Sequence, residues 1–283
     1  MNDVKNEVRP GQSVELLKEL HILTRDGKMN QDSRRKLKQV YHLYQFIEPL
    51  LRQVQQAHAD IRLVDHGAGK SYLGFILYDL FFKTLADAHV YGIETRDELV
   101  RQSQQLAARL GFSAMSFLNL SAAASIDSDR LPERVDIVTA LHACNTATDD
   151  AIHFALKKRA RFVVLVPCCQ AEVAALLKKS KGTERSREVL TELWRHPIHT
   201  REFGSHATNV LRCLQLEAHG YQVSATELVG WEHSMKNELI IAQYKNLPRQ
   251  HATERLEQLL QTLGLEELRT RFFTAVDGSC TDQ

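Results

Sequence analysis

The residues best suited to bind a ligand run from Asp65 to Tyr72 and read Asp-His-Gly-Ala-Gly-Lys-Ser-Tyr. Two glycines in the spacing G-x-G allow the backbone to bend sharply and to approach a ligand closely. A helix that begins directly after them would present unpaired N–H groups to the same ligand. The carboxylate of Asp65 can accept hydrogen bonds from a cationic or amino-bearing ligand. We therefore expect a ligand-binding turn between a strand and a helix.

Two nucleotide-binding turns share part of this pattern. The phosphate-binding loop of ATPases ends in Gly-Lys-Ser, as residues 69–71 do, but it needs a further glycine five residues before Gly69, where the chain has Val64. The dehydrogenase motif G-x-G-x-x-G needs its third glycine at the position of Tyr72. Neither motif is complete, so the sequence disfavours both an ATPase and a dehydrogenase.

The elements that must position this turn alternate between strands and helices. Short apolar runs typical of strands lie at residues 61–65, 88–94, 114–118, 135–140 and 162–166. Such alternation implies right-handed β-α-β units and a parallel sheet. Two later runs, at residues 221–229 and 238–244, also read as strands. The connection between these two is too short for a crossover, so we expect them to pair antiparallel.

Helical patterns precede and follow the predicted sheet in the sequence. Residues 1–58 are expected to form an N-terminal helical extension, in which Pro49 kinks or breaks a long helix. Residues 59–248 are expected to form the ligand-binding domain, and residues 249–283 a C-terminal helix and tail. One closing helical segment is predicted over residues 253–273.

The composition is that of an ordinary globular protein, with 43% hydrophobic and 25% charged residues among 283. Because the formal net charge is only +1, a polyanionic partner must be argued from local clusters. The five cysteines are odd in number and form no disulfide framework, which favours a reduced, cytoplasmic protein. No stretch is long and apolar enough to suggest a membrane span.

An acidic residue on the second predicted strand adds to the ligand-binding pattern. Glu94 closes that strand, where a carboxylate can hold the two hydroxyl groups of a ribose. Neighbouring parallel strands bring their carboxyl ends to one edge of a sheet, so we expect Glu94 beside Asp65, Gly67 and Gly69. In the alternative interpretation, the glycines form only a tight turn and Glu94 is a solvated carboxylate.

With these residues in place, the chain resembles the class I methyltransferases that depend on S-adenosylmethionine (SAM). Residues 65–73 are similar to the first motif of a methyltransferase-domain group, D-x-G-x-G-K-(G/S)-Y-L. Leu-His-Ala-Cys at residues 141–144 and Pro-Cys-Cys at residues 167–169 match two further segments of that group. The acceptor-stem tRNA 2′-O-methyltransferases look like distant relatives. The sequence departs from the pattern at Asn145, where Asp is expected, and at Ser71, where many methyltransferases have glycine.

The resemblance implies an α/β fold: a Rossmann-like seven-stranded methyltransferase sheet with an antiparallel last strand, plus the N-terminal helical extension. It also implies an enzyme with SAM as its cofactor and no metal. Glu94 would hold the ribose of SAM. The other cofactor-binding residues implied are Asp65, Gly67 and Gly69 at the amino-acid end, Lys70 and Tyr72 in the same motif, and Asn119 and Leu120 beside the adenine.

Candidate catalytic residues follow the fourth and fifth predicted strands. They are His142, Cys144, Cys168 and Cys169. A cysteine here would be a nucleophile if the enzyme resembles the RNA cytosine-C5 methyltransferases, and His142 would be a base that deprotonates the acceptor. His142 or His233 with the cysteines would alternatively bind a metal. We favour a third interpretation, in which the thiols pack as small side chains.

RNA is the expected substrate, with tRNA or rRNA preferred. Basic clusters run from Arg34 to Lys38, from Lys157 to Arg161 and from Lys178 to Arg187. These clusters would contact phosphates, unless they are only solvated faces. Trp194, Trp231 and His233 are candidates for stacking on bases. The alternatives are a methyltransferase of a small molecule or protein, and a non-catalytic SAM- or RNA-binding module.

Overall fold

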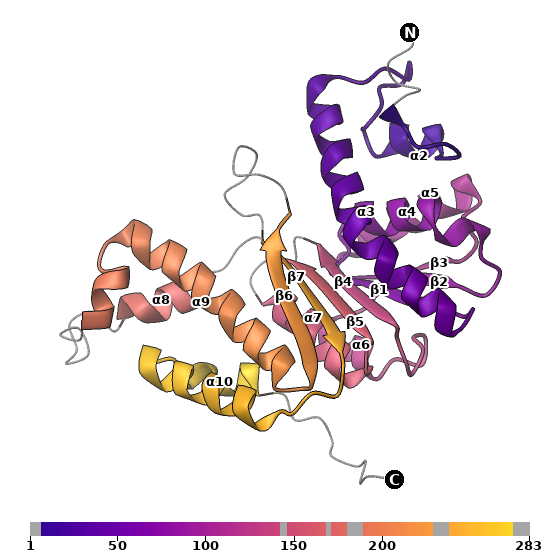
Figure 1. Ribbon diagram of the computed structural model, residues 1–283. Coiled ribbons are helices and arrows are strands. Elements are labelled where there is room, and N and C mark those ends of the chain that lie inside the picture. The colour runs from indigo at the N-terminus through magenta and orange to yellow at the C-terminus, as the bar shows by residue number, and fades with distance from the viewer. Residues whose placement is uncertain (1–6, 142–145, 168–170, 180–188, 229–237, 274–283) are drawn as a thin grey trace, which may run out of the picture.

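The structure is a computed structural model that describes residues 7–141, 146–167, 171–179, 189–228 and 238–273. A seven-stranded sheet lies at its centre in the order β3-β2-β1-β4-β5-β7-β6 (Figure 1). The strands are β1 (Arg62–His66), β2 (His89–Glu94), β3 (Met115–Asn119), β4 (Ile137–Leu141), β5 (Phe162–Val166), β6 (Tyr221–Glu227) and β7 (Glu238–Tyr244). The first five are parallel, and β7 is antiparallel to both β5 and β6. The predicted methyltransferase-type fold is therefore confirmed.

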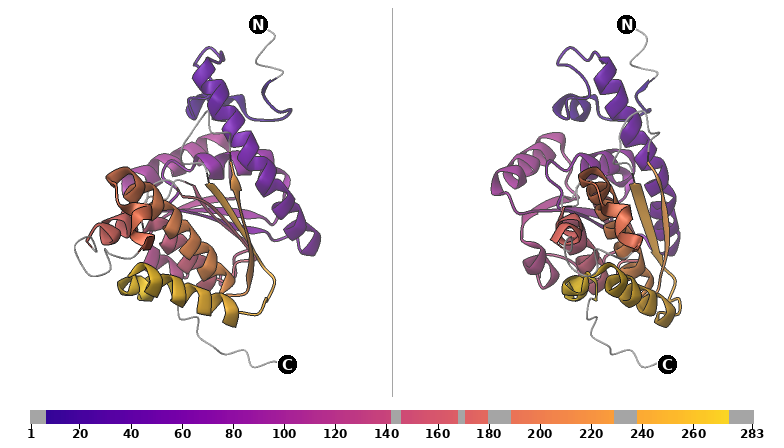
Figure 2. Two further views of the ribbon diagram at one scale, coloured as in Figure 1. Left: turned by 60° about the vertical axis from the view of Figure 1, so that its left-hand side comes forward. Right: turned by 90° about the vertical axis from the view of Figure 1, so that its left-hand side faces the viewer.

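Helices cover both faces of the sheet (Figure 2). Alternation of side chains along β1 sends Leu63 to one face and Val64 to the other. On the Leu63 face lie α3 (Gln31–Ala57), α4 (Tyr72–Leu80) and α5 (Asp97–Leu110). On the Val64 face lie α6 (Ala122–Ile126), α7 (Ala147–Lys157) and the end of α9 (Pro197–Glu217). The sheet is thus buried on two sides, as its apolar strands require.

The strand order reverses at β1, which pairs with β2 on one side and β4 on the other. In open α/β sheets, ligands bind outside the carboxyl ends of the strands at such a switch point. The turn that follows β1 therefore occupies the place where this architecture forms its binding crevice.

The predicted N-terminal extension, residues 1–58, contains α2 (Val14–Glu19) and α3. The helix α3 continues through Pro49, so of the two predicted alternatives, a kink or a break, the break is wrong. Pro49 is exposed, whereas the nearby Ile47 and Leu51 are fully buried in the core shared with the sheet. This packing holds the helix together despite the hydrogen bond that proline removes.

The C-terminal helices pack against α8 (Glu172–Lys179) and α9. Together these helices share one apolar cluster. The predicted helical segment over residues 253–273 is divided in the structure, because α10 (Gln250–Leu263) ends at Gly264, which adopts a left-handed φ of 68°. A short helix, α11 (Arg269–Phe272), follows it. The predicted domain boundaries stay predictions. Among the described residues, no helix combines the length and apolarity needed to cross a bilayer.

Candidate active site

The turn between β1 and α4 is built from residues in the left-handed region. Gly67 has φ 68°, Gly69 has φ 58° and Ser71 has φ 49°. Glycine adopts this region without steric cost. Ser71 carries a Cβ and is strained there, which explains why glycine suits that position in related motifs. Its hydroxyl offsets the strain by donating to Asp65 Oδ2 at 3.1 Å.

Asp65 fastens this turn to the neighbouring strand. Its side chain is 2% exposed, and its Oδ1 accepts from the Thr139 hydroxyl on β4 at 2.9 Å. Burial raises the pKa of Asp65 to about 6, although hydrogen bonds from Thr139, Ser71 and the Gly74 backbone oppose the rise. Both carboxylate oxygens are engaged within the protein. The contact of Asp65 with the amino-acid end of SAM stays a prediction.

Glu94 lies at the end of β2 and joins that strand to the glycine turn. Its Oε2 accepts the Gly69 N–H at 2.8 Å, and its Oε1 accepts the Arg96 N–H at 3.0 Å. The Arg96 side chain forms an ion pair with the same carboxylate. Burial raises the pKa of Glu94, but the hydrogen bonds and charge of Arg96 and the Gly69 amide outweigh it and hold the pKa at about 2. Glu94 is therefore an anion at neutral pH, in direct contact with the turn.

A cavity of about 380 Å³ opens beside this pair. Of the predicted cofactor-binding residues, Gly67, Glu94 and Leu120 line it. A volume of this order is usual for small-molecule sites. One ionised carboxylate, a glycine turn and an apolar wall suit a ligand that has hydroxyl groups at one point and a flat apolar ring at another.

Seven lining residues were not among those predicted to bind the cofactor: His66, Ile93, Thr95, Arg96, Ala122, Ala147 and Asp150. His66 was hidden within the motif, although strand alternation requires its side chain to leave β1 on the face opposite Asp65. Ala147 and Asp150 belong to the first turn of α7, and no local motif announces them. That turn is held in place by Asp149, whose Oδ1 lies 2.6 Å from Nε of the fully buried Arg212.

Asn119 is placed differently from its neighbour Leu120. Its side chain is exposed, and its amide donates to the Thr95 carbonyl at 2.8 Å. It thereby braces the chain after β2 without lining the cavity. A contact of Asn119 with adenine stays a prediction.

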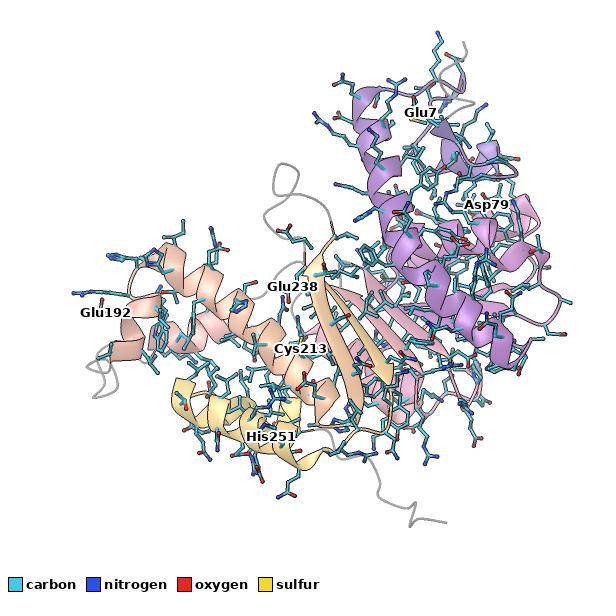
Figure 3. All side chains as sticks on the ribbon, in the orientation of Figure 1. Glu7, Asp79, Glu192, Cys213, Glu238 and His251 are labelled. Atoms are coloured by element: carbon cyan, nitrogen blue, oxygen red, sulfur yellow. The ribbon has the colours of Figure 1, made fainter. Side chains whose placement is uncertain are left out.

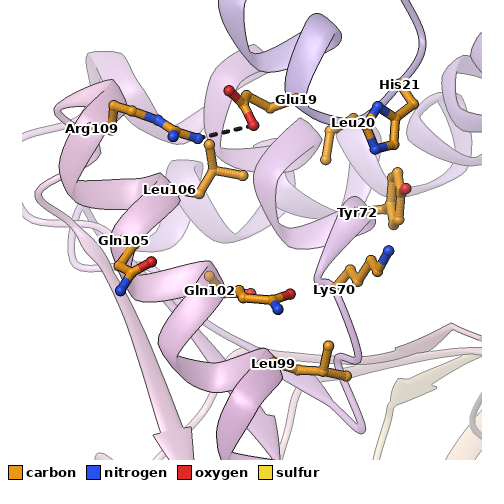
Figure 4. Close-up of a pocket in the computed structure, with 11 residues that line it drawn as sticks. Glu19, Leu20, His21, Lys70, Tyr72, Leu99, Gln102, Gln105, Leu106 and Arg109 are labelled. Carbon is orange, nitrogen blue, oxygen red and sulfur yellow. Dashed lines mark ion pairs between the residues drawn. The ribbon is translucent and has the colours of Figure 1, made fainter.

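Lys70 and Tyr72 line a second cavity, of about 280 Å³, between the end of α2 and α5 (Figure 4). The opposite wall includes Glu19 and Arg109, which form an ion pair at 2.9 Å. Neither Lys70 nor Tyr72 lines the cavity beside Glu94. The structure therefore places these two residues at a different cavity from Gly67, Glu94 and Leu120, and their contact with SAM stays a prediction.

The candidate catalytic residues His142, Cys144, Cys168 and Cys169 lie outside the described residues, as do Asn145, Trp231 and His233. The strands that precede the four candidates are neighbours, with Leu141 opposite Val166 at their ends. Among the residues that the structure describes, no group of three or more histidine, cysteine or acidic side chains is arranged to hold a metal ion.

Two further side chains with potential chemistry belong to the packing of the protein. Cys213 lies on α9 near Glu238 (Figure 3), and burial raises the pKa of its thiol to about 12, so it is not a nucleophile at neutral pH. Trp194 is 4% exposed and stacks on Phe203 with ring centroids 5.0 Å apart. The prediction that Trp194 stacks on bases is wrong, because α9 and its neighbours bury the indole.

Part of the chain is similar to a group of known mammalian proteins. The chain is similar to the glutathione S-transferase C-terminal domain-containing proteins of Bos taurus, at 30% identity over 149 residues, and of Homo sapiens, at 29%. These matches cover 52% of this chain and 21% of each relative, so the chain spans about a fifth of their length.

Two solved structures are also similar. One is magnesium protoporphyrin IX methyltransferase from Synechocystis PCC 6803 with bound SAH (S-adenosylhomocysteine), with 17% identity, a TM-score of 0.45, and 86% of this chain and 100% of that one covered. The other is the N-terminal domain of human METTL16 in complex with SAH, with 12% identity, a TM-score of 0.43, and 72% and 70% covered.

A comparison with models of protein families shows to which family the chain belongs. A family model described as a methyltransferase domain matches residues 35–176, which is half of the chain. The matched segment contains β1 to β5 and therefore the whole of the Glu94 cavity. The chain belongs to this family of methyltransferase domains, whose methyl donor is SAM.

Proposed function

We propose that this chain transfers the methyl group of SAM to RNA. The observation that carries the proposal is the contact between Glu94 and the Gly69 amide, at 2.8 Å, beside the cavity at the carboxyl ends of the strands. It places an ionised carboxylate and the glycine turn together at the switch point of the sheet. This is the arrangement that a nucleoside with an amino-acid tail requires.

The residues that line the cavity fit SAM. Glu94 would accept hydrogen bonds from the ribose hydroxyls, and the small apolar side chains of Leu120, Ala122 and Ala147 would flank the adenine. The turn at Gly67 would face the amino-acid end. When bound, SAM supplies an electrophilic methyl group on a sulfonium. The protein then needs only to position the acceptor and remove its proton.

The acceptor would approach across the ends of β4 and β5. The segments that follow Leu141 and Val166 contain His142 and the cysteine candidates. His142 is proposed as the base that takes the acceptor proton, and the cysteines as packing or nucleophilic groups. Because these strands are neighbours, both segments start from the same edge of the sheet.

Exposed cations support a polyanionic acceptor. Lys178 and Lys179 end α8, which follows β5. Lys36 and Lys38 are exposed on the first turns of α3, beside Arg35, which pairs with Asp32 at 3.6 Å. These two helices project on different sides of the strand ends (Figure 1). Cations so arranged can track phosphates on both sides of an acceptor nucleotide.

Other cations of the predicted clusters are less suited to this role. Arg34 is paired with Glu7 at 2.8 Å. Lys158 is buried, and the segment that contains it and Arg161 precedes β5 at the amino-terminal edge of the sheet. This edge is opposite to the cofactor cavity, so α3 and α8 are the helices proposed to contact RNA.

The experiment combines binding and transfer. Calorimetry with SAM should give a measurable affinity, and labelled SAM with total cellular RNA should give label that ribonuclease removes. Glu94→Gln is the matched control, because it removes the charge at constant size. Label that survives ribonuclease and is found in protein or in small molecules would contradict RNA as the acceptor. Absence of SAM binding by the unmodified chain would contradict the whole proposal.

A further inference from the structure

His66 is a buried polar residue without a partner in the described part of the chain. It ends β1, is 4% exposed, and neither Nδ1 nor Nε2 has a hydrogen-bond partner there. Buried polar atoms in folded proteins are nearly always paired, so an exception calls for an explanation. The imidazole packs beside the ring of Phe154 on α7, with the two ring centroids 5.4 Å apart.

The place of His66 in the fold suggests what its partner is. The side chain lines the same cavity as Glu94 and Leu120. It lies on the face of the sheet covered by α6 and α7, because Phe154 and the neighbouring Val64 belong to that apolar cluster. This is the side on which Leu120, Ala122 and Ala147 form the apolar wall proposed for adenine. The amino-acid end of SAM, by contrast, is assigned to the glycine turn.

We propose that His66 is a positioning residue that hydrogen-bonds the adenosyl group of SAM. The inference rests on the SAM-binding part of the proposed function and is independent of the RNA part. A neutral imidazole has one N–H donor and one acceptor nitrogen, and the adenosyl group offers both kinds of partner in its amino group, ring nitrogens and hydroxyls. The ligand would thus satisfy nitrogens that the described residues leave unpaired.

The electrostatics of the pocket agree with this role. Burial lowers the pKa of His66 to about 4, so the ring is uncharged at neutral pH. An uncharged ring does not repel the positive sulfonium of SAM. It also keeps the acceptor nitrogen that a protonated imidazole would lose.

The role predicts opposite effects on stability and on binding. His66→Leu replaces an unpaired buried polar ring by an apolar side chain of similar volume, so the melting temperature of the free protein should rise by ~2–4 °C. The same variant should bind SAH about tenfold more weakly, because it cannot pair with the ligand. A residue with only a structural role would not give this combination.

Two further variants complete the test. His66→Gln keeps a donor and an acceptor and should retain SAH affinity within about threefold. His89→Leu is the matched control: His89 is half-buried in β2, its Nε2 is paired with the Ser116 hydroxyl at 2.8 Å, and it does not line the cavity. This control should leave SAH affinity unchanged.

The experiment is calorimetry of SAH and of 5′-methylthioadenosine, which lacks the amino-acid end, with melting curves of each free variant. Equal losses of affinity for both ligands in His66→Leu support a contact with the adenosyl group. A loss confined to SAH, or SAH affinity equal to that of the unmodified protein, would overturn the inference. If the unmodified protein binds neither ligand, both the proposed SAM site and the inference about His66 are wrong. If it binds both ligands and His66→Leu binds them equally well, only the inference about His66 is wrong.

Discussion

The guanidinium of Arg96 covers the carboxylate of Glu94, with Nε 3.0 Å from Oε1 and Nη2 3.1 Å from Oε2. The Gly69 amide also donates to Oε2. When a ribose binds to Glu94, its hydroxyl groups must therefore replace at least part of these hydrogen bonds to the carboxylate. The Arg96 side chain is 67% exposed, so water can replace the carboxylate around it when the exchange occurs.

The first prediction concerns this exchange. Glu94→Gln should weaken SAH binding roughly 10- to 100-fold, since a hydrogen bond to a charged group contributes about 1.5–3 kcal/mol. Arg96→Ala should instead strengthen it by up to about fivefold, because an exposed ion pair is worth about 0–1 kcal/mol. Calorimetry measures both. Arg101→Ala, which removes an exposed ion pair with Asp97 on α5, is the control, and a weaker affinity in Arg96→Ala would contradict the exchange.

The second prediction tests the contact between the glycine turn and α4. A Cβ added at Gly74 would lie 2.4 Å from Ser71 Oγ, so the two positions are coupled. Gly74→Ala should cost about 1–3 kcal/mol of unfolding free energy, as overpacking usually does. Ser71→Gly removes the clashing hydroxyl and should restore most of that loss in the double variant. Denaturant unfolding of the four proteins measures the coupling, and strictly additive effects would show that the contact is not the cause.

The third prediction concerns pH and two adjacent residues of β1. Asp65 has a folded-state pKa of about 6, above its ordinary value of 3.8, so its contribution to stability is complete below pH 3.8 and is lost as pH rises through 6. His66 has a folded-state pKa of about 4, below its ordinary value of 6.5, so its contribution is complete above pH 6.5 and is lost as pH falls through 4. The two slopes oppose each other in the same window.

Single variants should reveal the two slopes separately. Between pH 4 and 6.5, the stability of His66→Leu relative to the unmodified protein should fall as pH rises, by about 3 kcal/mol in total. The relative stability of Asp65→Asn should rise over the same window by a similar amount. Chemical denaturation at several pH values checks both signs. Two difference curves that stay flat would mean that neither group titrates as its burial requires.

The order of the strands and helices was predictable, because the spacing of apolar residues and the length of each apolar run are local features of the sequence. The strand at residues 162–166 was predicted to the residue, since five consecutive apolar residues suit a central parallel strand. The helix α5 ends before Gly111, a residue type that marks helix stops in a sequence, and the glycine adopts the left-handed φ of 70° that such a stop favours. Pro49 left a kink and a break as alternatives, because the tertiary packing of Ile47 and Leu51 that keeps the helix continuous is not visible in a local pattern.

The candidate site was predictable only where a motif fixes the backbone. Gly69 and Glu94 stand at the ends of two strands, so their approach follows from topology. The partners of Asp65 were not predictable, because Thr139 comes from β4, 74 residues away, and carries no motif. Asp150 reaches the cavity through the placement of α7 on the sheet. Lys70 belongs to the motif but lines another cavity, so its contact with SAM stays a prediction.

The last prediction tests the RNA surface. Lys178→Glu with Lys179→Glu reverses two exposed charges at the end of α8 and should weaken RNA binding while SAH affinity is unchanged. The slope of log affinity against log salt should fall by roughly 0.7–0.9 for each phosphate that the variant no longer neutralises. Filter binding or fluorescence anisotropy over a range of salt concentrations measures both quantities, and equal melting temperatures would show that the fold is retained.

A matched double reversal separates a specific surface from general attraction. Arg134→Glu with Arg159→Glu changes the charge by the same amount, but both residues are exposed on segments that precede β4 and β5, at the edge opposite the cofactor cavity. An RNA held across the strand ends would not touch them. The RNA affinity of this control variant, and the dependence of that affinity on salt, should therefore stay close to those of the unmodified protein. If the control weakens binding as much as the α8 variant does, the attraction depends on net charge alone and α8 is not the RNA-binding surface.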